Sequence, residues 1–184
     1  GTEDLGGGLK ASFVLESQIA ADTGVGGGTT TMSGTATASL LNRASNVALS
    51  SASAGTLTLG RMNRIDYDAV VSQYAFGGNN FGGATNVAYL GANIDGNEAR
   101  ISNAVKYTSP SISGLVVSYQ HGFGEQAGDA KKYRQSVVGA DLTVGQLKLT
   151  ATYGDEKSST GAKAEDRTQF LASYNFGVLK AFAG

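Results

Sequence analysis

Residues 147–153 read LKLTATY, and the order of these letters decides the fold. The odd positions from Leu147 to Tyr153 are apolar or aromatic, whereas Lys148 and two threonines occupy the even ones. Residues 169–176, QFLASYNF, repeat the pattern with Leu171 as an exception. Because successive side chains of a strand point to opposite faces, a period of two predicts strands with one apolar and one polar face.

The same alternation recurs along the chain and predicts nine strands. They cover residues 9–19, 43–50, 56–62, 100–108, 115–121, 134–144, 147–153, 167–176 and a partial strand from Val178. The links alternate between short (51–55, 109–114, 145–146, 177) and long (20–39, 65–99, 122–133, 154–166). Long loops at one end and short turns at the other are typical of a membrane barrel with a wet interior, and a soluble β-sandwich has no reason for this asymmetry.

Composition narrows the function classes. The 184 residues include 27 glycines, one proline and no cysteine, with a formal net charge of −1 and a mean hydropathy of −0.10. No window has the apolar period of a helix over several turns, and no apolar run approaches the ~18–20 residues of a membrane-spanning helix. The near-neutral charge gives no reason to expect nucleic acid. His121 is the only histidine, so neither a catalytic triad nor a histidine-based zinc site is available, and we expect no enzyme activity, metal or cofactor.

Five segments together resemble one known family. In chain order they read GTEDLGGGLKASFVLE (1–16), NRASNVALS (42–50), GTLTLGR (55–61), NAVKYTSPSISGL (103–115) and LASYNFGV (171–178). They are similar to the trimeric general-diffusion porins of Gram-negative outer membranes, in the β-proteobacterial branch. The resemblance implies an all-β fold, a 16-stranded antiparallel transmembrane β-barrel, with the third external loop folded into the pore. On that register the chain begins at the turn after the second strand and ends in or near the eleventh.

The resemblance assigns residues 1–184 to part of a single barrel domain. Porins of this kind are about twice as long and end on an aromatic residue, whereas this sequence ends at Gly184. Nine strands cannot close an up-and-down barrel, because an open edge leaves backbone groups unpaired in lipid. We therefore expect the sequence to be an internal part of a porin that forms no pore by itself.

Residues 65–99 are the candidate constriction loop. They exceed the ~12–15 residues of an ordinary loop and show no convincing period. FGG occurs at Phe76, Gly77 and Gly78 and again at 81–83. The first FGG resembles the tip of the family's constriction loop, where glycine lets the backbone fold back against the wall. The alternative is a disordered external loop.

Four arginines are candidates for the charged part of the barrel wall that faces this loop. Arg43 matches the family's constriction arginine on the fourth strand, yet simple parity puts it on the lipid face with Val47. Arg61 meets the same conflict beside Leu59. An arginine facing mid-bilayer costs ~2–4 kcal/mol, so we expect a bulge between Arg43 and Val47 and a bend at Gly60.

Two further arginines complete this set. Arg100 has the parity of Lys106 and points into the lumen, and Arg64 follows near the external rim. The alternative for all four arginines is a solvated position at the rim. Parity assigns a wider set of charged residues to the lumen, namely Lys10, Glu16, Lys106 and Asp141.

The loop's own charges are all negative. It carries no lysine or arginine, and its acids are Asp66, Asp68, Asp95 and Glu98. Facing an arginine-bearing wall, they create a transverse field. Residues 73–75 (QYA) occupy positions where related porins often have an acid, and fewer opposing acids favour anions. Residues 93–98 (NIDGNE) offer oxygen ligands but lack the full spacing of a calcium loop, and a turn is the alternative.

These patterns favour passive transport. We expect an outer-membrane channel for ions and small hydrophilic solutes, anion-preferring, with identical subunits (a homotrimer), outer-membrane lipid and lipopolysaccharide as partners. A β-rich structural or adhesive surface protein is the alternative, but it does not need a glycine-bearing loop between opposing charges. A soluble β-sandwich requires a packed core that contains Val138, Phe170, Tyr174 and Phe176.

Overall fold

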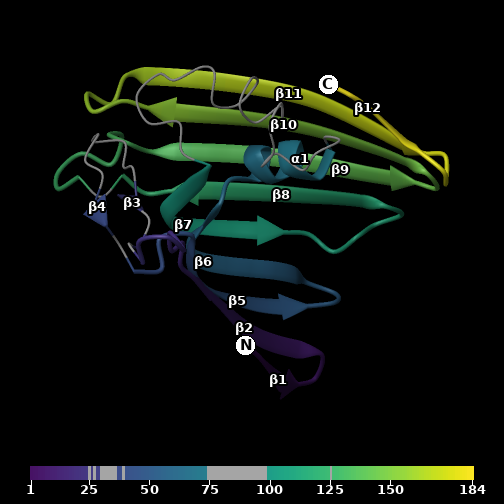
Figure 1. Cartoon of the computed structure of the whole chain (residues 1–184), viewed down its shortest axis with the longest axis horizontal. Helices are drawn as coiled ribbons and strands as arrows, with labels where there is room; N and C mark the ends of the chain where they lie inside the picture. Colours follow the sequence, from purple (N-terminus) through teal and green to yellow (C-terminus); the bar gives the residue numbers. More distant parts are fainter. Residues whose placement is uncertain (25, 27, 30–36, 39, 74–98, 125) are drawn as a thin grey trace.

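One curved antiparallel sheet dominates the structure. The computed structural model describes residues 1–24, 26, 28–29, 37–38, 40–73, 99–124 and 126–184. The predicted loop tip (Phe76, Gly77, Gly78) and the acids Asp95 and Glu98 lie outside these residues. Within them the sheet has ten strands, and a separate two-stranded hairpin and a single helix complete the fold (Figure 1).

The strands of the main sheet pair with their neighbours in chain order. They are β1 (Thr2–Gly6), β2 (Leu9–Glu16), β5 (Ala44–Ser51), β6 (Gly55–Asn63), β7 (Arg100–Thr108), β8 (Leu115–Gly122), β9 (Gln135–Val144), β10 (Leu147–Lys157), β11 (Lys163–Asn175) and β12 (Lys180–Ala183). The hairpin is β3 (Gly28–Thr29) with β4 (Thr37–Ala38), and the helix is α1 (Ile65–Gln73). Among the described residues, β1 and β12 are the free edges, so the sheet is not closed.

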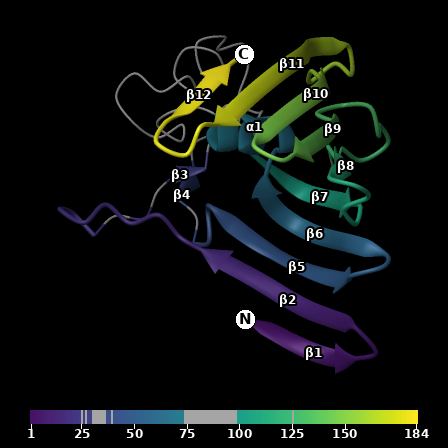
Figure 2. The ribbon, with the colours of Figure 1, turned by 90° about the vertical axis from the view of Figure 1, so that its right-hand side faces the viewer.

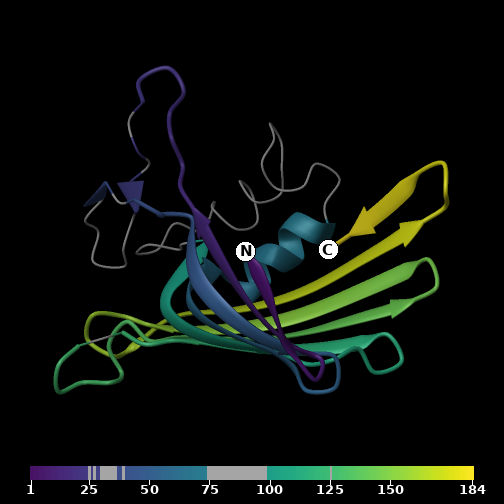
Figure 3. The same ribbon diagram turned by 90° about the horizontal axis from the view of Figure 1, so that it is seen from below.

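The sheet bends into a trough that carries α1 on its concave side (Figures 2 and 3). Hairpin turns gather at one end of the trough, and the connections that follow β2, β6, β8 and β10 leave from the other. Successive connections thus alternate between two distinct ends of the sheet, although the connection from β10 to β11 is short and not long as predicted. We call these ends the turn end and the loop end.

The convex face is apolar and exposed. Val138, Phe170, Tyr174 and Phe176 are 41%, 72%, 41% and 60% exposed. A soluble sandwich would bury these side chains in a core, so that alternative is wrong. On the concave face, polar side chains of the same strands are covered, among them Gln120, Thr150, Thr152 and Ser173.

Among the described residues, no helix combines the length and the apolar character that crossing a membrane requires.

The sequence pattern missed the first strand, the β3–β4 pair within the predicted link 20–39, the full length of β10 and β11, and the helix. Ten strands replace the predicted nine, because Thr2–Gly6 pairs with β2 although its sequence is mostly polar, so the chain begins with a strand before the first turn. Residues 154–166 are not a long loop, because β10 and β11 continue through most of them and Glu156 lies opposite Glu165. The segment after Arg64 begins with helix α1.

The predicted bend at Gly60 is confirmed. The pairing of β6 with β7 shifts register between Gly60 and Met62. Gly60 has a φ of 120°, and a Cβ there would lie 2.3 Å from the carbonyl oxygen of Ser45. Only glycine fits this conformation and this close approach.

Replacing Gly60 with alanine tests whether the bulge depends on glycine. We expect Gly60→Ala to lower the free energy of unfolding by about 1–3 kcal/mol, because the new Cβ meets backbone in a strained conformation. Urea titration of the porin that contains this chain measures the change. Gly26→Ala is the matched control, because a Cβ there meets no atom within 4 Å. Equal stability of the two variants would contradict the bulge's dependence on Gly60.

Candidate functional site

Helix α1 is docked on the inner wall where two glycines make room for it. A Cβ on Gly139 would lie 2.6 Å from Cγ2 of Ile65. A Cβ on Gly154 would lie 3.2 Å from a guanidinium nitrogen of Arg64. These glycines of β9 and β10 let the start of the helix approach the strand backbone. The described part of the predicted constriction loop therefore packs inside the trough.

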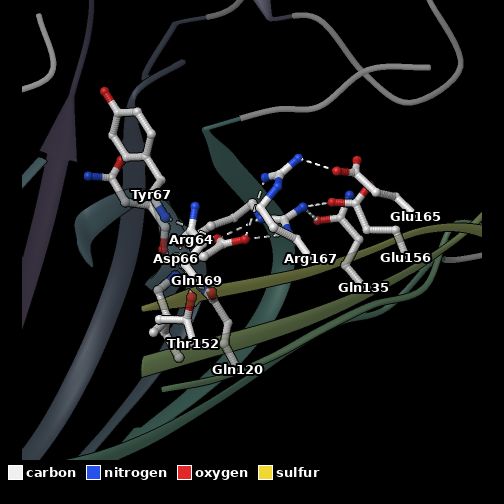
Figure 4. A network of polar contacts seen from close by, with 12 residues as sticks. Arg64, Asp66, Tyr67, Gln120, Gln135, Thr152, Glu156, Glu165, Arg167 and Gln169 are labelled. Carbon is white, nitrogen blue, oxygen red and sulfur yellow. Dashed lines mark hydrogen bonds and ion pairs between the residues drawn. The ribbon is translucent and has the colours of Figure 1, made fainter. Parts of the chain in front are cut away.

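A buried ion-pair network joins the loop to the wall. Arg64 Nε and Nη2 donate to the two carboxylate oxygens of Asp66 at 3.0 and 2.9 Å. Arg64 also pairs with Glu156 of β10, and Nη1 of Arg167 on β11 lies 3.7 Å from Asp66. Arg167 in turn pairs with Glu165. Figure 4 shows these side chains converging from the helix start and from the two strands, and we call them the loop anchor.

The centre of the loop anchor is strongly buried. The side chains of Arg64 and Asp66 are each 1% exposed, and that of Glu156 is 4% exposed. Charges so far from water are tolerated only with opposite charges and hydrogen bonds around them, and removing one partner typically costs about 3–5 kcal/mol. The anchor therefore holds α1 firmly while the full set of partners is present.

Neutral contacts extend this attachment along the helix. The backbone N–H of Ile65 donates to Oε1 of Gln120 at 3.1 Å, and Nε2 of Gln120 donates to the carbonyl oxygen of Asn63 at 3.0 Å. At the far end, Nε2 of Gln73 donates to Oγ1 of Thr150 at 2.7 Å. An apolar cluster between them joins Ala69 and Val70 to Leu171 of β11. The one apolar exception in QFLASYNF is thus the residue that packs against the helix.

Three arginines gather near the loop end of β5, β6 and β7. Arg43 Nε donates to Oε1 of Glu16 at the end of β2. Arg61 donates at 2.7 Å to the carbonyl oxygen of Asn42 and at 2.7 Å to Oγ of Ser102. The charge of Arg100 interacts with those of Arg43, Arg61 and Glu16. Within the described part of the chain, the three guanidinium groups lie near two carboxylates, those of Glu16 and Asp68, so positive charge is in excess there.

Among the described loop residues, Asp68 of α1 is an acid that interacts with this cluster. Its Oδ1 accepts a hydrogen bond of 2.8 Å from Nδ2 of Asn63, and its charge interacts with Lys106 and Arg100 of β7. Burial raises the pKa of the Asp68 carboxyl above its usual range, and the Asn63 hydrogen bond and the two cations offset part of that rise.

The structure separates the predicted constriction residues into two groups. Arg43, Arg61 and Arg100 cluster together, whereas Arg64 and Asp66 are buried in the loop anchor. Arg64 directly follows β6 at the loop end of the sheet, and its side chain is buried under the helix, so the alternative of a solvated position at the rim is wrong for this residue. The expected bulge between Arg43 and Val47 is absent: Arg43 precedes β5, so strand alternation does not apply to it, and β5 pairs regularly with β2 from Ala44 onward.

The residues assigned to the lumen share the concave side of the sheet. Asp141 accepts a hydrogen bond from Thr150 and lies 3.5 Å from Lys148 Nζ, next to the end of α1. Lys106 interacts with Asp68, and Glu16 pairs with Arg43. Lys10 has the parity of Glu16 in β2.

Sequence reasoning missed the wall half of the loop anchor. Glu156, Glu165 and Arg167 fall in the segment predicted as a loop or at its border. A signal was present, because Glu156 has the parity of the inward Thr152, and Arg167 that of the inward Gln169. Extending the alternation beyond residue 153 finds these residues.

An antiparallel wall with an apolar convex face and a loop folded onto its charged concave face is typical of a membrane β-barrel with a wet interior. A family model described as Gram-negative porin matches residues 1–184. The chain belongs to this family, and it is an outer-membrane protein.

Two relatives of known name are also outer-membrane porins. Outer membrane porin protein 32 of Delftia acidovorans is 33% identical over 191 residues, covering 98% of this chain and 50% of that protein. An outer membrane porin protein of Bordetella pertussis is 34% identical over 198 residues, covering 98% of this chain and 48% of that protein. The chain thus spans about half the length of the curated relatives it matches.

Solved structures show the same architecture. An anion-selective porin from Comamonas acidovorans superposes with a TM-score of 0.72 at 30% identity, over 97% of this chain and 53% of that one. OmpTdeltaL8, a loop-deletion mutant of OmpT from Vibrio cholerae, superposes with a TM-score of 0.55 at 17% identity, over 96% of this chain and 54% of that one. The second likeness is one of fold alone.

Neutralising the central cation of the loop anchor tests its role. We expect Arg64→Met to free α1 from the wall, at a cost of about 3–5 kcal/mol, because Asp66 and Glu156 lose their shared partner. Chymotrypsin cleavage within residues 65–99 of the folded porin measures the release. The control is Arg134→Met, which removes a partly exposed pair with Asp155 at 3.4 Å, a type worth about 0–1 kcal/mol. Equal protection of both variants would contradict an anchoring role.

Proposed function

We propose that the protein containing this chain forms a water-filled channel for passive diffusion of ions and small hydrophilic solutes, with a preference for anions. The observation that carries this proposal is the grouping of Arg43, Arg61 and Arg100 on the wall beside the loop helix. A local excess of positive charge raises the concentration of anions and lowers that of cations. The similarity to an anion-selective porin from Comamonas acidovorans supports the same preference.

In this proposal residues 65–99 form the constriction, and the loop anchor sets their position. Arg64 and Asp66 act by holding α1, and solutes meet the arginine cluster together with Lys106 and Asp68. We assign the tip of this loop to Phe76, Gly77 and Gly78, which lie outside the described residues. Lys10, Glu16 and Asp141 line the wider lumen.

The same proposal covers the oligomeric state of the protein and its lack of enzyme activity. The protein acts as a homotrimer in contact with outer-membrane lipid and lipopolysaccharide, and it is a channel and not an enzyme. Trimeric assembly is proposed on family membership, because one barrel wall does not define the neighbouring subunits.

Reversal potentials across a salt gradient test the arginine cluster. We expect Arg100→Gln to lower the permeability ratio of chloride to potassium by about sixteenfold, since a unit charge about 5 Å from a hydrated ion contributes about 0.8 kcal/mol in water, which favours chloride by about fourfold and disfavours potassium by the same factor. Lys180→Gln on β12 carries the same charge change and is the control. A wild-type porin that prefers cations would overturn the proposed selectivity.

The pH dependence of selectivity tests Asp68. As the pH falls through the raised pKa of Asp68, its carboxyl takes up a proton and the negative charge beside Lys106 and Arg100 disappears. We therefore expect anion preference to increase on acidification, starting at a higher pH than for an ordinary aspartate. In Asp68→Asn the preference is already increased and this step is missing. Asp129→Asn is the control, and retention of the step in Asp68→Asn contradicts the assignment.

A further inference from the structure

A pocket of about 480 Å³ opens on the outer surface of strands β8–β11, close to the loop end of the sheet. Its lining side chains come from three successive rows of the sheet, and each row has a different chemistry. We call it the rim pocket and describe its rows from the middle of the strands toward the loop end.

The first row is aromatic and apolar. Tyr119, Val138 and Tyr153 lie opposite one another in β8, β9 and β10. They are 48%, 41% and 44% exposed, so they form an open apolar floor. Tyrosines at this depth are typical of the boundary between hydrocarbon and headgroups, because the ring is apolar and the hydroxyl is polar.

The second row is polar and acidic. Ser136 lies opposite Asp155, and Asp155 lies opposite Asp166 of β11. Two carboxylates directly opposite repel each other, so this pairing needs nearby cations. The cations come from the third row and from the neighbouring loop.

The third row is basic. Lys157 lies opposite Lys163, and each pairs with a carboxylate of the row below, Lys157 with Asp155 at 3.0 Å and Lys163 with Asp166. Arg134 adds a second cation at 3.4 Å from Asp155. Three cations and two carboxylates leave the outer edge of the pocket with a net positive charge.

The pocket is built before any ligand arrives. The backbone N–H of Lys157 donates to the carbonyl oxygen of Arg134 at 2.9 Å, and that of Tyr133 donates to the carbonyl oxygen of Ser158 at 3.2 Å. These bonds fix the loop that precedes β9 against β10. The side chain of Lys157 is 21% exposed and pairs with Asp155, so it has little freedom to lose on binding, whereas that of Lys163 is 60% exposed.

We propose that the rim pocket binds the phosphorylated headgroup of a lipid of the outer leaflet. The long connections of bacterial barrels face outward, which puts the basic row at the depth of the outer headgroups. Phosphate oxygens accept hydrogen bonds from Lys157 and Lys163, while the lipid's apolar part lies on the tyrosine row. A free phosphate ion or a soluble anion would make no apolar contact with the tyrosine row and would gain no affinity from it. The inference rests on the outer-membrane location and not on the selectivity of the channel.

Lipid binding to the purified porin in detergent tests this proposal. Native mass spectrometry counts bound lipid during titration with bisphosphorylated lipid A, with its monophosphorylated form and with zwitterionic phosphatidylcholine. We expect tightest binding for the bisphosphorylated lipid and about thirtyfold weaker binding of it to the Lys157→Gln/Lys163→Gln double variant, since each basic side chain near an anionic lipid surface contributes about fivefold. Lys157→Arg/Lys163→Arg should restore binding.

The matched control removes the same charge from the same end of the sheet. Lys131→Gln/Lys132→Gln changes two lysines of the adjacent loop that do not line the pocket, and we expect less than a fivefold loss. Equal losses in the two double variants would show general attraction to the rim and overturn the pocket. Full competition by millimolar inorganic phosphate, or equal binding of all three lipids, would overturn it as well. Single-channel conductance of each variant reports folding and pore function separately from lipid binding.

Discussion

The attachment of α1 to the wall depends on the buried charges around Arg64. This guanidinium binds Asp66, two residues further along the chain, and Glu156 on β10, so it joins the loop to a strand that lies far along the sequence. A buried charge without its partners is far costlier than a surface one, and this asymmetry makes the attachment specific. The position of the helix, and with it the position of Asp68 opposite β7, follows from that contact.

The two faces of strand β10 meet different surroundings, the loop helix on one side and lipid on the other. Gly154 and Glu156 face the helix, whereas Tyr153, Asp155 and Lys157 face outward. The period of two lets a single strand carry a loop anchor on one side and a lipid-facing row on the other, without conflict between them. Changes on one face can therefore leave the chemistry of the other intact, which is useful in a wall that separates lipid from water.

The sequence predicted the features that depend on local backbone geometry, and it did not predict those that depend on packing between distant segments. The bend at Gly60 was predictable because Arg61 could not remain on the lipid face. Helix α1 was not, because it is short and buries Asp66 and Gln73 as well as Val70, so it shows no apolar stripe. The continuation of β10 and β11 through a charged segment was not predicted, because we took charge as a sign of a loop. In the structure Glu156 pairs with Arg64 and Glu165 pairs with Arg167.

The sequence by itself determined the strand order, the apolar and polar faces, the alternation of turn and loop ends and the membership of the porin family. Those properties follow from the period of two and from the residue types in the turns, both of which can be read from short stretches of the sequence. Only the tertiary structure decided which charges meet. It buried Arg64 and Asp66 with Glu156 and Arg167, and it brought Arg43, Arg61 and Arg100 together. Such contacts join residues far apart in the chain, and curvature, bulges and close approach at glycine set them.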